Sequence, residues 1–179
     1  KLTEEGKFED AAKIFENGIN MPKSYGEAKT FFNQEAHIFY FLGNLLNKQG
    51  RGEEALKAYE EAAIYKAAVS EISLFRALAL NKLNRFSEAE EVLNEMLEVA
   101  ENKIINCDLR GYYGVGSPTP MPFELDIERQ NLTDGNILKA YALLGFGKID
   151  EANAAIENAA EKDPYDFRIY AYRQIVSVI

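Results

Sequence analysis

The amino-acid sequence predicts an all-α fold, a right-handed α-solenoid of helix–turn–helix repeats with one irregular segment rich in proline, glycine and aromatic residues. The first observation behind this prediction is a pattern that recurs four times along the 179 residues. The second is the composition, 47% hydrophobic and 27% charged, which is typical of a globular chain. The third is the length, which allows burial of roughly 70% of the unfolded surface without a disulfide or a metal.

Each copy of the pattern has a turn residue, a short acidic stretch, an alanine and a bulky residue four positions later. The turn residues are Gly6, Gly50, Asn84 and Gly147, the alanines are Ala11, Ala55, Ala89 and Ala152, and the bulky residues are Phe15, Tyr59, Leu93 and Ile156. We expect the turn residue to take the left-handed conformation that closes a helix. The acidic stretch suits the first turn of the next helix. The alanine is small because the two helices cross closely there, and the bulky residue fills the seam.

The pattern places eight helices along a single domain, 1–179. They are expected near 8–18, 27–48, 53–66, 71–83, 87–101, 134–145, 149–161 and 166–178. Ser24 and Glu27 form a candidate capping box for the second helix. The segment 166–179 is predicted to cover the last repeat as a terminal capping helix. Because only five residues precede Gly6, the first repeat lacks most of its leading helix, and we expect the chain to be a piece of something longer.

The segment 102–133 is the irregular insertion. It holds three of the five prolines, and alternating prolines favour an extended run. Pro122 is a candidate start for a short helix over 123–130. One interpretation is that the apolar side chains of this segment plug the gap left by a degenerate repeat. The other is that the segment folds over a groove and supplies Tyr112, Tyr113 or Phe123 as ligand contacts.

The stretch from Phe39 to Ala62 resembles the tetratricopeptide repeat motif at nearly every diagnostic position. The matching residues are Phe39, Leu42, Gly43, Asn44, Lys48, Gln49, Gly50, Glu54, Ala55, Tyr59 and Ala62, and in the last repeat Ala140, Leu143, Gly147, Ala152, Ala159 and Pro164. The spacing of 34 residues from Ala55 to Ala89 equals the period of this family. The resemblance implies a scaffold that holds an extended peptide, or a neighbouring domain of the same parent chain, in a concave groove.

The same resemblance implies that one face of each leading helix lines the groove. The residues expected there are Tyr40, Asn44, Asn47, Lys48, Leu74, Leu78, Asn81, Lys82 and Tyr141. Amide and ammonium groups suit a peptide backbone or a carboxylate. The alternative is that the Asn–Lys pairs merely end solvated helices. His37 falls on this face too, either as an ordinary exposed or capped histidine or as a groove contact. Glu71 and Phe75 stand where family members that bind chaperone tails have basic residues, which disfavours that function.

The sequence provides no set of residues for catalysis, a cofactor or a metal. His37 and Cys107 are each the only residue of their kind, too few for a histidine-based metal site or a Ser–His–Asp triad. Charge at a helix start explains Glu124 and Asp126 better than general acid–base chemistry does. The net charge of −9 argues against binding nucleic acid or an anionic membrane surface. We therefore predict a protein that is not an enzyme and that has a protein or peptide partner.

Two further hypotheses stay open. The insertion loosely resembles a stretch in the C-terminal repeat region of large bacterial proteins that carry an N-terminal, β-sandwich-rich region of carbohydrate-active type. That resemblance implies a non-catalytic accessory region of a glycan-processing protein. The other hypothesis is self-association through exposed ends of the repeat array.

Overall fold

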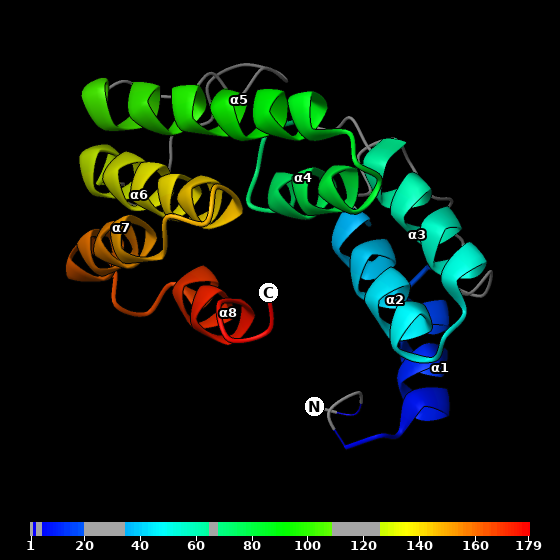
Figure 1. Ribbon diagram of the computed structural model, residues 1–179. Helices are drawn as coiled ribbons and strands as arrows, with labels where there is room; N and C mark the ends of the chain where they lie inside the picture. The colour runs from blue at the N-terminus through cyan, green and yellow to red at the C-terminus, as the bar shows by residue number, and fades with distance from the viewer. Residues whose placement is uncertain (1, 3–4, 20–34, 65–67, 109–125) are drawn as a thin grey trace, which may run out of the picture. The chain divides into compact units, whose positions relative to one another are not determined.

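The computed structural model describes residues 2, 5–19, 35–64, 68–108 and 126–179. These residues form eight helices and no strand, so the all-α prediction is confirmed (Figure 1). The helices are α1 (Phe8–Ile19), α2 (Ala36–Lys48), α3 (Gly52–Ile64), α4 (Ser73–Lys82), α5 (Phe86–Ile105), α6 (Ile127–Gly145), α7 (Ile149–Lys162) and α8 (Phe167–Ile175). None of the helices in the described part of the chain is long and apolar enough to span a membrane.

The chain divides into two compact units, Lys1–Leu93 and Asn94–Ile179. In the first unit α2 pairs with α3, α4 packs against both, and α1 packs against α2. In the second unit α6 pairs with α7, and α8 packs against both of them. The single domain predicted for 1–179 stays a prediction, and each unit is described below by itself.

The turns within the helix pairs have the predicted geometry. Gly6, Gly50, Asn84 and Gly147 have φ angles of 74°, 75°, 59° and 73°, in the left-handed region. Behind Gly50, the Arg51 N–H donates to the Leu46 carbonyl at 3.0 Å, and this bond closes α2. Glycine and asparagine adopt this conformation at low cost, so the turn residue fixes where each leading helix ends.

The seam between paired helices is also as predicted. The four repeat alanines are all buried, as are Tyr59, Leu93 and Ile156, whereas Phe15 of α1, the fourth bulky residue, is half-buried. In the α2–α3 pair Gly43 faces the Tyr59 ring so closely that a Cβ atom on Gly43 would lie 2.5 Å from Cε1. In the α6–α7 pair Ala140 holds the matching place and is fully buried. Small residues therefore let the helices approach, and the bulky residue of the second helix fills the space.

The helices predicted over 123–130 and 134–145 belong to one continuous helix, α6, which begins at Ile127 behind the N-cap Asp126. The break predicted between them is wrong, and residues 123–125 lie outside the described part of the chain. Polar side chains do not break it, because Thr133 Oγ1 donates to the Arg129 carbonyl and Asn136 Nδ2 to the Leu132 carbonyl, both at 2.8 Å.

The helix predicted over 27–48 begins instead at Ala36, since Glu35 has non-helical backbone angles. The predicted cap at Ser24 and Glu27 lies outside the described residues. The insertion is also shorter than 102–133, because α5 continues to Ile105 and α6 starts at Ile127.

Candidate functional site

The two leading helices of the first unit, α2 and α4, each end in an Asn–Lys pair. We call Asn47, Lys48, Asn81 and Lys82 the Asn–Lys stripe. Asn47 and Lys48 end α2, while Asn81 and Lys82 end α4, the helix packed beside it, at places 34 residues further on. Asn47, Lys48 and Lys82 are exposed, and Asn81 is half-buried. Lys48 and Lys82 are exposed side chains, and neither forms an ion pair with a described residue.

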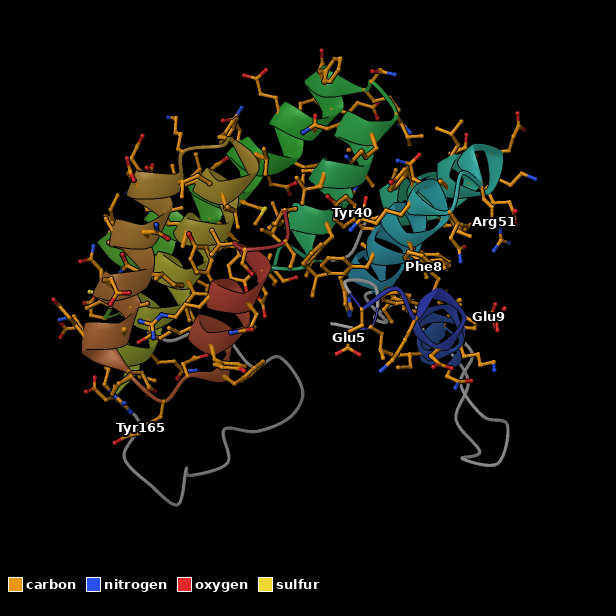
Figure 2. The ribbon with its side chains drawn as sticks, turned by 60° about the horizontal axis from the view of Figure 1, so that its bottom comes forward. Glu5, Phe8, Glu9, Tyr40, Arg51 and Tyr165 are labelled. Atoms are coloured by element: carbon orange, nitrogen blue, oxygen red, sulfur yellow. The ribbon has the colours of Figure 1, made fainter. Side chains whose placement is uncertain are left out.

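Deeper on the same helices, aromatic rings form a cluster. The rings of Tyr40, Phe41 and Phe75 all contact one another, with centroid distances of 5.5 Å (Tyr40–Phe41), 5.9 Å (Tyr40–Phe75) and 5.3 Å (Phe41–Phe75). Figure 2 labels Tyr40 on its helix. The Tyr59 hydroxyl donates to Asn44 Oδ1 at 2.8 Å. Burial raises the pKa of Tyr40, an effect that a hydrogen bond with Asn44 opposes. The predicted contacts Tyr40 and Asn44 therefore hold the first unit together.

The remaining predicted contacts divide between core and surface. Leu74 and Tyr141 are 0% and 1% exposed, and the Tyr141 hydroxyl donates to the Arg168 carbonyl at 3.3 Å. As placed, these side chains contribute to packing. Leu78 is half-buried beside the stripe residue Asn81. Tyr112, Tyr113 and Phe123 lie outside the described residues.

His37 sits half-buried at the start of α2, 6.0 Å from the Phe75 ring between centroids. Its Nδ1 atom is buried and has no hydrogen-bond partner among the described residues. Burial lowers the pKa of His37 below its ordinary value of 6.5, against a smaller opposing effect of the Glu35 charge. The neutral imidazole is therefore favoured in the folded chain.

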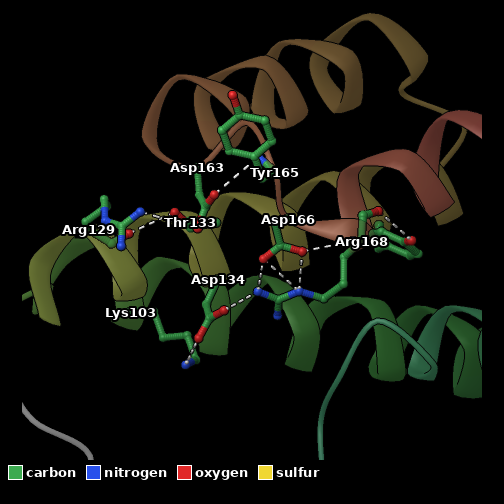
Figure 3. Close-up of polar contacts among 9 residues, drawn as sticks. Lys103, Arg129, Thr133, Asp134, Asp163, Tyr165, Asp166 and Arg168 are labelled. Carbon is green, nitrogen blue, oxygen red and sulfur yellow. Dashed lines mark hydrogen bonds and ion pairs between the residues drawn. The ribbon is translucent and has the colours of Figure 1, made fainter. Parts of the chain in front are cut away.

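The second unit has a charged cavity of about 310 Å³, between the start of α6 and the connection from α7 to α8 (Figure 3). It is lined by Asp126, Arg129, Gln130, Thr133, Asp134, Asp163, Asp166 and Arg168. The lining has two more carboxylates than guanidinium groups. In the part of the chain that the structure describes, no group of three or more His, Cys, Asp or Glu side chains is placed to hold a metal ion.

Ion pairs within the lining neutralise much of this charge (Figure 3). Arg168 Nη2 lies 2.6 Å from both Asp134 Oδ1 and Asp166 Oδ2. Lys103 Nζ reaches the other Asp134 oxygen at 3.3 Å. Asp166 also caps α8 by accepting the Arg168 N–H at 2.9 Å. The hydrogen bond from Arg168 lowers the pKa of Asp166 below its ordinary value of 3.8, so this carboxylate stays ionised and structural.

Sequence reasoning missed this cavity, although a signal was present. Arg129 pairs with Asp163 at 3.4 Å, and Asp134 pairs with Arg168. Both pairs join residues 34 positions apart. Stacked repeats place equivalent positions side by side, so opposite charges one period apart predict an ion pair between neighbouring repeats.

Helix pairs that share a register, turn residues and seam residues define an α-helical repeat protein. The family model for the tetratricopeptide repeat matches residues 3–68 and 40–102, which together span 3–102 of the 179 residues. The chain belongs to the tetratricopeptide repeat family. No curated protein and no solved structure matches the chain. Repeats of this family generally mediate protein–protein interaction, and their all-helical fold is typically non-catalytic.

Proposed function

We propose that this protein is a binding scaffold whose Asn–Lys stripe holds an extended peptide with an acidic side chain or a free C-terminal carboxylate. The observation that carries the proposal is the repetition of Asn–Lys at equivalent ends of α2 and α4, two helices in direct contact. A single exposed Asn–Lys pair is an ordinary helix end. Two such pairs, one repeat apart on neighbouring helices, offer the same donors twice, so an extended peptide can bind to both.

The chemistry of the stripe fits this ligand. Each asparagine amide offers two donors and one acceptor, which suits a peptide backbone. Each lysine ammonium supplies a charge-assisted bond to a carboxylate. The stripe carries two lysines and no acidic residue, in a chain of net charge −9, and this local positive charge suits an acidic ligand. Leu78, half-buried next to the stripe, offers an apolar contact for a peptide side chain.

A peptide-capture experiment tests the proposal. Acidic peptides and peptides with a free C-terminus are compared with amidated, neutral peptides of the same length for binding to the wild-type chain and to Lys48→Glu/Lys82→Glu. We expect the double reversal to weaken capture of the charged peptides at least about tenfold, because it replaces two attractions by repulsions. Lys57→Glu, an exposed position on α3, is the matched control.

The control is expected to bind as the wild type does, and the melting temperatures of all three chains show whether the fold is retained. Equal capture by wild type and double variant would rule out the stripe as the binding surface. The insertion residues Tyr112, Tyr113 and Phe123 stay candidate contacts, as does the hypothesis of an accessory region in a glycan-processing protein.

A further inference from the structure

Helix α4 carries opposite charges at the two ends of one face. Glu71 comes just before the helix, and Lys82 ends it. Ile72 has helical backbone angles and the Leu74 N–H donates to the Glu71 carbonyl at 3.3 Å, so the helical path extends back to Glu71. Leu78 follows Glu71 by seven positions and precedes Lys82 by four, a spacing that puts all three on one face. Glu71 and Leu78 are half-buried, and Lys82 is exposed.

The described part of the chain provides no counter-charge for either end of this face. Neither Glu71 nor Lys82 forms an ion pair with a described residue. Arg76, also on α4, donates instead from Nε to the Ala63 carbonyl at 3.0 Å. His37 lies one period before Glu71, but burial lowers its pKa, so the neutral imidazole is favoured there. A ligand with two opposite charges would therefore find an attractive group at each end.

The length of the face sets the spacing of the charges in such a ligand. Glu71 and Lys82 are eleven positions apart, which corresponds to about 16 Å along a helix. An extended peptide covers this distance in about five residues, at roughly 3.3 Å each. Leu78 precedes Lys82 by about 6 Å along the axis, so it faces the peptide residue about two places before the carboxylate.

We propose that the ligand of the Asn–Lys stripe is a peptide with a basic side chain about five residues before the carboxylate that Lys82 binds, and that Glu71 selects this side chain. The inference rests on the proposed function, because the carboxylate held at the stripe fixes the register of the peptide. The two opposite charges also fix its direction, since a reversed peptide places like charges together.

A lysine scan in N-acetylated nine-residue peptides tests this spacing. Each peptide has a free C-terminus, leucine two residues before the last, glycine and serine elsewhere, and one lysine placed three to eight residues before the last. The reference peptide has no lysine. We expect the affinity measured by calorimetry to peak with lysine about five residues before the last. The peak should lie about three- to fivefold above the reference, as for one partly exposed ion pair.

A second series ends in an amidated glutamate in place of the free carboxylate. It distinguishes an acidic side chain from a chain terminus as the group that binds the stripe, and a peak in either series supports the proposal.

Variants of Glu71 show whether this residue causes the peak. Glu71→Gln should abolish the peak and leave the affinity for the reference peptide unchanged. Glu71→Lys should make lysine at that place unfavourable and glutamate there favourable, because the sign of the charge is reversed. Glu61→Gln, which removes an exposed carboxylate on α3, is the matched control and should keep the wild-type profile. Circular dichroism shows whether each variant is folded.

A flat lysine profile overturns the inference, and so does a peak that persists in Glu71→Gln. In both cases the proposed function stands as long as Lys48→Glu/Lys82→Glu weakens binding of the reference peptide. A wild-type chain that binds none of these peptides contradicts the proposed function, and the inference fails with it.

Discussion

The two units use the 34-residue period in opposite ways. In the first unit, positions one period apart carry like residues, Asn47 with Asn81 and Lys48 with Lys82. In the second, they carry opposite charges: Arg129 pairs with Asp163, and Asp134 pairs with Arg168. The opposite charges of the second unit form ion pairs that join neighbouring repeats. The Asn and Lys side chains of the first unit cannot pair in this way, so their N–H donors are available to another molecule. The same stacking thus produces a closed ion-pair network in one unit and an accessible stripe in the other.

The seams of the two units differ as well. In the α2–α3 pair a glycine accommodates a tyrosine ring, Gly43 against Tyr59, and in the α6–α7 pair Ala140 is combined with Ile156. Each combination keeps the helices close, because a smaller residue on the leading helix balances a larger one on the second helix. The size of a seam residue in one helix pair therefore indicates which substitution the equivalent position of the other pair can accommodate.

Removing the guanidinium group of Arg168 should have the largest effect. We expect Arg168→Leu to reduce the stability of the second unit by about 2 kcal/mol, because Asp166 loses its partner and Asp134 keeps only Lys103. Lys82→Leu, the comparable change in the first unit, should alter stability by less than about 0.5 kcal/mol. Hydrogen exchange in α6–α8 and in α2–α4 measures the two units separately. A loss of similar size in both variants would contradict the proposed difference between network and stripe.

Gly43→Ala should destabilise the first unit by about 1 kcal/mol. The added Cβ meets the buried Tyr59 ring at 2.5 Å, and overpacking of about 1–3 kcal/mol exceeds the gain of about 1 kcal/mol from replacing a helical glycine. In a Tyr59→Ile background the ring that the new Cβ meets is gone, so Gly43→Ala should cost less there than in the wild type, although Tyr59→Ile alone loses the hydrogen bond to Asn44. Denaturant unfolding of the wild type, both single variants and the double variant measures this coupling. An equal cost of Gly43→Ala in both backgrounds would show that Tyr59 does not set the size limit at position 43.

A pH titration should show the smallest difference between the units. Because burial lowers the pKa of His37, the unfolded chain binds its proton first as the pH falls below 6.5. The contribution of neutral His37 to the free energy of unfolding is therefore complete above pH 6.5. It is lost as the pH falls from 6.5 through the lowered pKa of His37 in the folded state. In the second unit, the lowered pKa of Asp166 gives stabilisation that is complete only above its ordinary value of 3.8 and is lost below it.

Hydrogen exchange measured between about pH 7 and pH 5, around the ordinary histidine pKa, should therefore show weakening in α2–α4 first. His37→Gln should remove this dependence, and Asp166→Asn should change only the response at lower pH. An unchanged pH profile in His37→Gln would show that the histidine is not responsible.

Much of the fold was predictable from local chemistry. The left-handed residues Gly6, Gly50, Asn84 and Gly147 set the helix ends, and the alanine five residues after each of them set the seams. These features depend on backbone sterics and residue size, which the sequence states directly. The start of α6 was mispredicted because the proline- and glycine-rich insertion was expected to continue to residue 133, whereas the helix begins at Ile127.

The candidate site was predictable only in part. The sequence predicted the Asn–Lys stripe as a binding surface, because like residues recur at one period on leading helices, and its role in binding stays a prediction. It did not show that Tyr40, Leu74 and Tyr141 are buried, since inward or outward placement on a leading helix depends on which neighbour packs against it. Local sequence thus determined where the helices turn and where they touch. Only the packing of neighbouring helices decided which side chains a partner can reach, because burial is a property of the assembled repeats and not of any one helix.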